Sequence, residues 1–299
     1  MRRASTSIPV FFSERMVAPD AGGSPSASKP RHVVAAWRAA NFPLTLHDVT
    51  PASVDELARA HARDFVEDIL SGERGNAFGT RSLEVARSLP FTTGAMLSAA
   101  RHVRDTGAPV AAAPVSGFHH AGHASAGAYC TFNGLMVTAL ALLDEGRART
   151  VGILDCDMHY GDGTDDILDA LDVRDRVPHF TAGAHFHHPS DARAFFRWLD
   201  ITLDALTACD VVLYQAGADP HVDDPLGGFL TDAELARRDR AVFAALKALG
   251  VPVVWNLAGG YQLDADGGIR KVLAIHDATM RACVDAFVEN GVDDPAREP

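Results

Sequence analysis

Residues 151–163, VGILDCDMHYGDG, join a short apolar run to a cluster of ionisable side chains. The apolar run has the length and composition of a buried β-strand. Asp155, Asp157 and His159 follow at alternate positions, which in an extended chain places their side chains on the same face. Charged groups at the edge of a core cost several kcal/mol unless they are paired or bind a cation. The stretch therefore predicts a metal site at the carboxyl end of a strand, and a solvated acidic loop is the alternative.

Three other short apolar runs end in polar or glycine-rich segments. They are 110–115 before SGFHHAGH at 116–123, 211–215 before AGADP at 216–220, and 253–257 before AGGY at 258–261. Strand patterns that alternate with helical patterns indicate a parallel sheet with crossover helices. Because open α/β sheets bind ligands at the carboxyl ends of their strands, we expect these four segments to converge.

The predicted fold class is α/β, a single-domain open parallel sheet with helices on both faces, over residues 1–299. A first strand is predicted at 10–12. Apolar periodicity predicts helices within 33–40, 54–60, 65–70, 91–103 and 135–143, and a capping box at Thr231 predicts another that ends at Gly250. Composition predicts a flexible loop at 18–30 and a polar tail at 290–299.

Composition excludes several classes of protein. A formal net charge of −12 argues against a nucleic-acid-binding protein, which would carry a basic stripe. The sequence shows no convincing signal segment and no apolar stretch long enough to span a membrane, so we expect no membrane association and a cytoplasmic location. The four cysteines form no C-x-x-C pair, which indicates buried reduced thiols rather than a disulfide framework or a cysteine zinc site.

The order of these motifs resembles the zinc-dependent histone deacetylase family, which has the arginase/deacetylase fold and includes bacterial histone deacetylase-like amidohydrolases. The resemblance covers roughly residues 90–280. The matching elements are the tandem His119-His120, YCTFN at 129–133, the block 155–163, AGAD at 216–219 and GGY at 259–261.

By this resemblance, Asp157, His159 and Asp219 match the ligands of one Zn²⁺ per chain, with Fe²⁺ as the alternative metal. Two carboxylates and one imidazole leave a zinc ion an open position for water and substrate. The resemblance also implies a K⁺ ion near Asp155, Asp157 and His159, with backbone carbonyls around residues 181–182.

The resemblance also implies the catalytic groups. His119 and His120 match the tandem active-site histidines, His120 as general base and acid and His119 as an electrostatic partner. Asp155 matches the acid that hydrogen-bonds His119, and Asp162 matches the acid of His120. Tyr261 matches the tyrosine whose hydroxyl stabilises the oxyanion.

The substrate is less strongly indicated. Tyr129, His188, Leu226, Gly259 and Gly260 are candidates for the wall of a substrate tunnel. The loop at 72–79 has no clear counterpart of the aspartate that peptide-binding relatives use, which puts a protein substrate in doubt.

The expected reaction is hydrolysis of an N-acetyl or N-acyl amide of a lysine or related amine to acetate and free amine. Acetylpolyamine or another small molecule is the alternative substrate.

Two other functions are weighed. A non-catalytic acyl-lysine or metabolite-binding protein would not need every catalytic residue that is present. A two-manganese ureohydrolase of the same fold would carry Asp-x-His-x-Asp and would have no role for Tyr261. The sequence leaves the oligomeric state open.

Overall fold

The computed structural model describes residues 6–19 and 24–289. Within these ranges, seven strands form one sheet in the order β2-β1-β3-β7-β6-β4-β5, and every neighbouring pair is parallel. The strands are β1 (Ile8–Phe11), β2 (Leu44–His47), β3 (Val110–Ala112), β4 (Val151–Asp155), β5 (His179–Thr181), β6 (Val211–Gln215) and β7 (Val253–Asn256). The predicted parallel sheet is confirmed.

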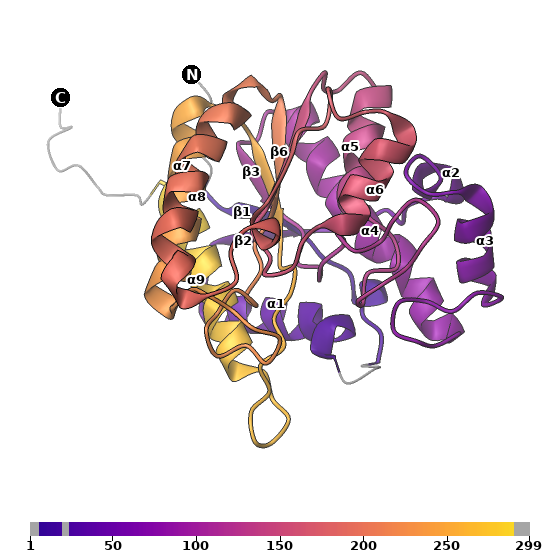
Figure 1. Cartoon of the computed structure of the whole chain (residues 1–299), viewed down its shortest axis with the longest axis horizontal. Helices are drawn as coiled ribbons and strands as arrows, with labels where there is room; N and C mark the ends of the chain where they lie inside the picture. The colour runs from indigo at the N-terminus through magenta and orange to yellow at the C-terminus, as the bar shows by residue number, and fades with distance from the viewer. Residues whose placement is uncertain (1–5, 20–23, 290–299) are drawn as a thin grey trace, which may run out of the picture.

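Helices cover both faces of this sheet (Figure 1). On one face, α1 (Lys29–Ala39), α7 (Ala192–Ala205), α8 (Asp232–Leu249) and α9 (Arg270–Phe287) pack on one hydrophobic cluster. On the other lie α2 (Val54–Leu57), α3 (Arg63–Ser71), α4 (Leu83–Thr106), α5 (Gly134–Asp144) and α6 (Asp162–Leu171). Side chains that alternate along a strand enter the two clusters in turn, as at Val110 and Ala111. The extent of the domain, 1–299, stays a prediction.

The central strands are buried on both faces, which explains their apolar runs. All residues of β4, β6 and β7 are buried. The helix predicted at 135–143 is α5, and its first ten residues are buried. The capping box predicted at Thr231 is present, and Gly250 ends α8 in the left-handed conformation.

Helix α4 is longer than predicted. It begins at Leu83, after Ser82 caps it, and continues through Pro90. The sequence pattern placed the start after this proline, because proline removes a helical hydrogen bond and usually breaks a helix. Here the carbonyl of Pro90 accepts from the backbone N–H of Ala52. Gly94 on the same helix lets this segment approach, because a Cβ there would lie 2.2 Å from the carbonyl oxygen of Thr50.

The flexible loop predicted at 18–30 is wrong for residues 24–30. Pro25–Ala27 form a 3₁₀ helix that Ser24 caps, and α1 begins at Lys29. Ser24, Ser26 and Lys29 are buried. Composition predicted a loop because serine and proline favour turns, but here these residues form helix ends that pack into the fold. Residues 20–23, and the tail predicted at 290–299, lie outside the described residues.

All four cysteines are buried and free. None of the helices in the described ranges is long and apolar enough to cross a membrane.

Candidate metal and catalytic site

Two loops that follow neighbouring strands bring three potential metal ligands together. Asp157 and His159 follow β4, and Asp219 follows β6, which pairs with β4. One ligand atom from each residue lies within 4.8 Å of the others. Nδ1 of His159 is 3.1 Å from Oδ1 of Asp157 and 3.1 Å from Oδ2 of Asp219. The structure therefore brings together the three residues that the resemblance matched to metal ligands.

The chemistry of this group fits a cation. Among the described residues, Oδ1 of the buried Asp219 has no hydrogen-bond partner. Burial and the Asp157 carboxylate raise the pKa of Asp219 to about 8. Hydrogen bonds with Asp157 and Asp219 raise the pKa of His159 to about 11. A buried carboxylate oxygen without a partner is costly, and two carboxylates with one imidazole form a donor set that catalytic metals use. The group can therefore hold a metal ion.

Gly259, a candidate for the tunnel wall, lies directly against this group. Its N–H donates to Oδ2 of Asp157 at 2.8 Å. A Cβ at this position would lie 2.3 Å from Oδ2 of Asp219 and 2.9 Å from Oδ2 of Asp157. No side chain fits in this space, so glycine is required. The next residue, Gly260, has φ +140°, a conformation that also favours glycine.

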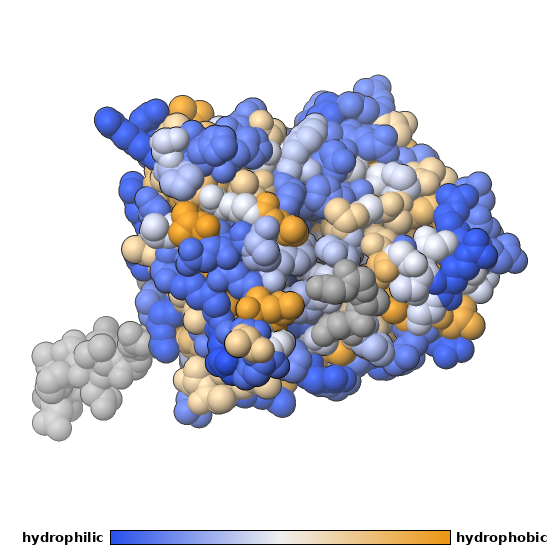
Figure 2. All heavy atoms as spheres, turned by 60° about the horizontal axis from the view of Figure 1, so that its bottom comes forward, coloured by the Kyte–Doolittle hydropathy of each residue, from blue (hydrophilic) through white to orange (hydrophobic). Residues whose placement is uncertain are grey.

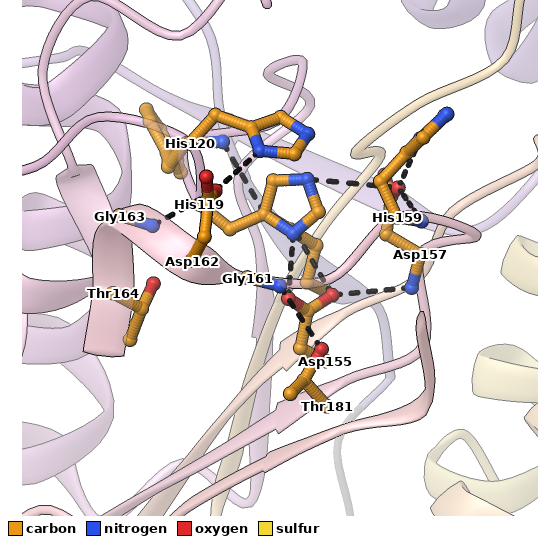
Figure 3. A network of polar contacts seen from close by, with 12 residues as sticks. His119, His120, Asp155, Asp157, His159, Gly161, Asp162, Gly163, Thr164 and Thr181 are labelled. Carbon is orange, nitrogen blue, oxygen red and sulfur yellow. Dashed lines mark hydrogen bonds and ion pairs between the residues drawn. The ribbon is translucent and has the colours of Figure 1, made fainter. Parts of the chain in front are cut away.

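Two histidine–aspartate pairs lie beside Asp157 and His159, two of the potential ligands (Figure 3). Nδ1 of His119 is 2.7 Å from Oδ2 of Asp155, and Nδ1 of His120 is 2.6 Å from Oδ1 of Asp162. Nε2 of His119 is 3.6 Å from Oδ1 of Asp157. The contacts match the pairing that the resemblance implied.

The pKa values of the two imidazoles are shifted in opposite directions. Burial opposes protonation of His119, but the carboxylates of Asp155 and Asp157 outweigh it and raise its pKa to about 9. Burial and the neighbouring His119 lower the pKa of His120 despite its bond to Asp162. Near neutral pH this arrangement favours a charged His119 next to a neutral His120 that can accept a proton.

Tyr261 is held beside the same group. Its N–H donates to Oδ2 of Asp224 at 2.9 Å, and its ring centroid lies 6.5 Å from that of His159. Burial and the carboxylates of Asp157 and Asp219 raise the pKa of the Tyr261 phenol far above its usual value. The phenol is therefore protonated and can donate a hydrogen bond.

Two other tunnel candidates lie close to Tyr261. The Tyr129 ring lies 5.9 Å from the ring of Tyr261 and 5.8 Å from that of Phe78, with Tyr129 itself at φ +65°. Leu226 is 51% exposed, and its N–H donates to Asp224, the residue that also binds the N–H of Tyr261. Figure 2 shows hydrophobic residues in small, separate groups on a mainly hydrophilic face.

His188, a candidate for the wall of the substrate tunnel, lies in the segment 185–188, and its place on a tunnel wall stays a prediction. His188 is exposed and precedes the 3₁₀ helix Pro189–Asp191, where its N–H donates to Asp191. Phe186 in the same segment is buried and packs on Phe195 and Phe229. A phenylalanine flanked by polar residues gives no sequence signal that separates a rim position from a core position.

Several residues that support the site were missed from the sequence. Lys29 is fully buried, and its Nζ donates to the carbonyl of Ala258 at 2.5 Å. Gln215, the last residue of β6, donates from Nε2 to Oδ1 of Asp155 at 3.0 Å. Nδ1 of His123 lies 2.8 Å from the carbonyl oxygen of Ala60. Only Gln215 had a signal, since it is a polar residue at the end of an apolar strand.

The histone deacetylase domain model matches residues 26–188, more than half of the 299 residues. The chain belongs to the histone deacetylase family.

Two similar relatives show the range of the family. The chain is 30% identical over 176 residues to acetylpolyamine amidohydrolase 1 of Pseudomonas aeruginosa. The matched region covers 50% of this chain and 50% of the relative. The chain is 31% identical over 150 residues to histone deacetylase 8 of Arabidopsis thaliana, covering 47% of this chain and 38% of the relative. The chain spans about half the length of the acetylpolyamine amidohydrolases that it matches.

Solved structures of the family share the fold. Acetylpolyamine aminohydrolase from Burkholderia pseudomallei aligns with a TM-score of 0.73 over 93% of this chain and 99% of its own. The HD domain of HDA15 aligns with a TM-score of 0.75 over 95% of this chain and 92% of its own. Both are 20% identical in sequence to this chain. These likenesses confirm the predicted arginase/deacetylase-like fold.

Proposed function

We propose that this chain is a Zn²⁺-dependent amidohydrolase that removes an acetyl or other acyl group from a lysine or related amine. The observation that carries the proposal is the Asp157–His159–Asp219 group, with a protonated phenol and a neutral imidazole beside it. The names of the relatives, acetylpolyamine amidohydrolases and histone deacetylases, support an acetyl amide as substrate.

The residues have separate parts in the reaction. A metal ion held by Asp157, His159 and Asp219 would polarise the acyl carbonyl and make a water molecule more acidic. His120 takes the proton of the attacking water and later gives it to the departing amine. His119, charged and held by Asp155, stabilises the negative charge that develops next to it. The Tyr261 phenol donates to the oxyanion, a contribution of the kind that is worth about 3–4 kcal/mol.

The substrate class can be separated by a panel of amides. Acetyl-lysine peptides, N-acetylated polyamines and longer-chain acyl-lysine amides would each be compared by kcat/KM. The chain's net charge of −12 favours encounter with cationic amines but adds nothing to the chemical step. A K⁺ ion near Asp155 and a cytoplasmic location remain predictions.

The metal assignment is tested by replacing Asp219 with alanine. The variant loses one of the two carboxylates, so it should lose metal in elemental analysis and all turnover. Asp223→Ala is the matched control, since this exposed aspartate lies four residues further along the same loop. Full zinc occupancy in Asp219→Ala would overturn the assignment.

The Tyr261→Phe variant separates a hydrolase from an acyl-binding protein. It removes one hydroxyl and little volume, so the fold and zinc content should be kept. The kcat should fall on the order of a hundredfold or more, with little change in substrate affinity. A variant that turns over like the parent would show that the phenol only packs against the loop.

A further inference from the structure

Arg238 on α8 forms hydrogen bonds with both of the loops that carry the potential metal ligands. Its side chain is fully buried. Its Nη1 donates to the carbonyl of Cys156 at 3.1 Å and to the carbonyl of Gly217 at 2.7 Å. Cys156 directly precedes Asp157, and Gly217 lies two residues before Asp219. One guanidinium nitrogen therefore connects the backbone next to both carboxylates.

A network on three elements fixes the guanidinium. Its Nε donates to Oδ1 of Asp239 at 2.8 Å. Oδ1 of Asp239 also accepts from the hydroxyl of Tyr214 on β6, and Oδ2 accepts from the hydroxyl of Thr279 on α9 at 2.6 Å. Asp239, Tyr214 and Thr279 are buried. Because Asp239 neutralises the charge and is itself held, the fork of Arg238 has a defined direction.

The position of this contact follows from the sheet. Strands β4 and β6 pair as far as Asp155 and Gln215, and the chains then leave the ladder. Beyond this point the carbonyls of Cys156 and Gly217 need other donors, because buried backbone groups are almost always paired. The carboxylates of Asp157 and Asp219, which repel each other when both are charged, project from these two loops. A bridge between the carbonyls limits how far the loops can move apart.

We propose that Arg238 is a positioning residue, which holds the loops after β4 and β6 at the separation that metal binding by Asp157 and Asp219 requires. The inference rests on the proposed metal site. Groups that orient metal ligands typically contribute 10–100-fold to metal affinity. Arg238 does not contact the ligand atoms, and its effect passes through the backbone of Cys156 and Gly217.

The test compares Zn²⁺ dissociation constants, measured by competition with a chromogenic chelator, in the full chain. The double variant Arg238→Met/Asp239→Asn removes the buried charges together, a change that often leaves stability nearly unaltered. The amide introduced at position 239 can still accept from Tyr214 and can donate to the hydroxyl oxygen of Thr279. We expect this variant to keep its thermal transition but to bind Zn²⁺ about 10–100-fold more weakly.

Arg238→Lys tests whether charge alone is sufficient. In Arg238, Nε contacts Asp239 and Nη1 contacts both carbonyls. A lysine keeps the charge, but its single Nζ cannot take both of these positions, so this variant should bind Zn²⁺ more weakly than the parent. Arg101→Met is the matched control, because Arg101 is a partly buried arginine on α4 that pairs with Glu145 and Glu56 on the opposite face of the sheet. It should bind Zn²⁺ like the parent.

The outcomes separate the two proposals. If the parent does not bind Zn²⁺, or Asp219→Ala binds like the parent, the metal site is wrong. If the parent binds and the folded double variant binds equally well, the role of Arg238 is wrong. If the double variant does not fold, Arg238→Lys decides by the same criterion, and parental affinity there overturns the inference.

Discussion

The two histidine–aspartate pairs of the site have nearly the same geometry and different surroundings. The ring centroids of His119 and His120 lie 4.1 Å apart. The distance from Nδ1 to the carboxylate oxygen is 2.7 Å between His119 and Asp155 and 2.6 Å between His120 and Asp162. His119 is 2% exposed and Asp155 is fully buried, whereas the side chain of Asp162 is 62% exposed. The pairs therefore differ mainly in their access to water.

This difference shows how burial assigns separate tasks to identical side chains. Besides its contact with His119, the Asp155 carboxylate accepts hydrogen bonds from the side chain of Gln215 and from the N–H of Asp157, so its orientation is fixed. Its negative charge, close to His119 and poorly screened, favours the imidazolium. The Asp162 carboxylate is in contact with water, so its hold on His120 is weaker. One pair is suited to a constant charge and the other to moving a proton.

The largest effect is expected from breaking the proton-transfer pair. His120→Ala should lower kcat about 10²–10⁴-fold, the range typical for loss of a general acid–base group. His119→Ala should lower it less, because it removes a neighbouring charge and leaves the proton acceptor in place. Both variants should keep their metal in elemental analysis. The comparison fails if His119→Ala is the more severely impaired of the two.

Substitution of Asp155, the partner of His119, should lower kcat more than substitution of Asp162, the partner of His120. This is the opposite of the order expected for the two histidines. Asp155→Asn keeps the volume but removes a buried charge, and we expect kcat to fall about 10–100-fold. Asp162→Asn should cost less than about fivefold, since exposed charge pairs are worth roughly 0–1 kcal/mol. Steady-state kinetics at low and high salt provide the measurement, and only the effect of Asp162→Asn should shrink with salt. Equal losses would show that exposure does not distinguish the pairs.

The residues of both pairs were matched by the family resemblance, whereas the local pattern alone indicated only part of the site. Asp155, Asp157 and His159 were found because they follow an apolar run at alternate positions, a local pattern. Lys29 and Arg238 were missed, although both are buried at the site. Lys29 falls in the segment 18–30 that was predicted as a loop, and Arg238 lies on a helix. A charged residue on a helix normally indicates solvent, and only the tertiary packing places these two inside.

The same limit applies to the secondary structure. The strands β4 and β6 were predicted from runs of buried residues, which a central parallel strand requires. Strand β2 was missed, because Leu44–His47 lies at the edge of the sheet and none of its four residues is buried. The start of α4 was placed after Pro90, at residue 91, but the helix begins at Leu83 and includes the proline.

A third histidine, His61, provides a comparison for His119, because both are buried and only one lies among carboxylates. The N–H of Asn133 donates to Nε2 of His61 at 2.8 Å, so Nδ1 carries the proton and donates to the carbonyl of Gly122 at 2.8 Å. Burial lowers the pKa of His61 to about 4. Protonation of Nε2 would also break the bond from Asn133. His61 is therefore held neutral.

A further effect, on stability and not on catalysis, is the contribution of His61 to the free energy of unfolding as the pH falls. The unfolded chain binds a proton at this histidine near pH 6.5 and the folded chain only near pH 4, so the free energy of unfolding decreases between these values. The slope is at most about 1.4 kcal/mol per pH unit, and the loss is complete below pH 4, at about 3 kcal/mol. His61→Gln removes the titration but can still donate to Gly122 and accept from Asn133. Urea unfolding at pH 7 and pH 5 should therefore show a smaller loss of stability for His61→Gln than for the parent. His188→Gln, at an exposed histidine, is the control and should lose as much stability as the parent. An identical loss in all three proteins would mean that His61 is protonated in the folded chain.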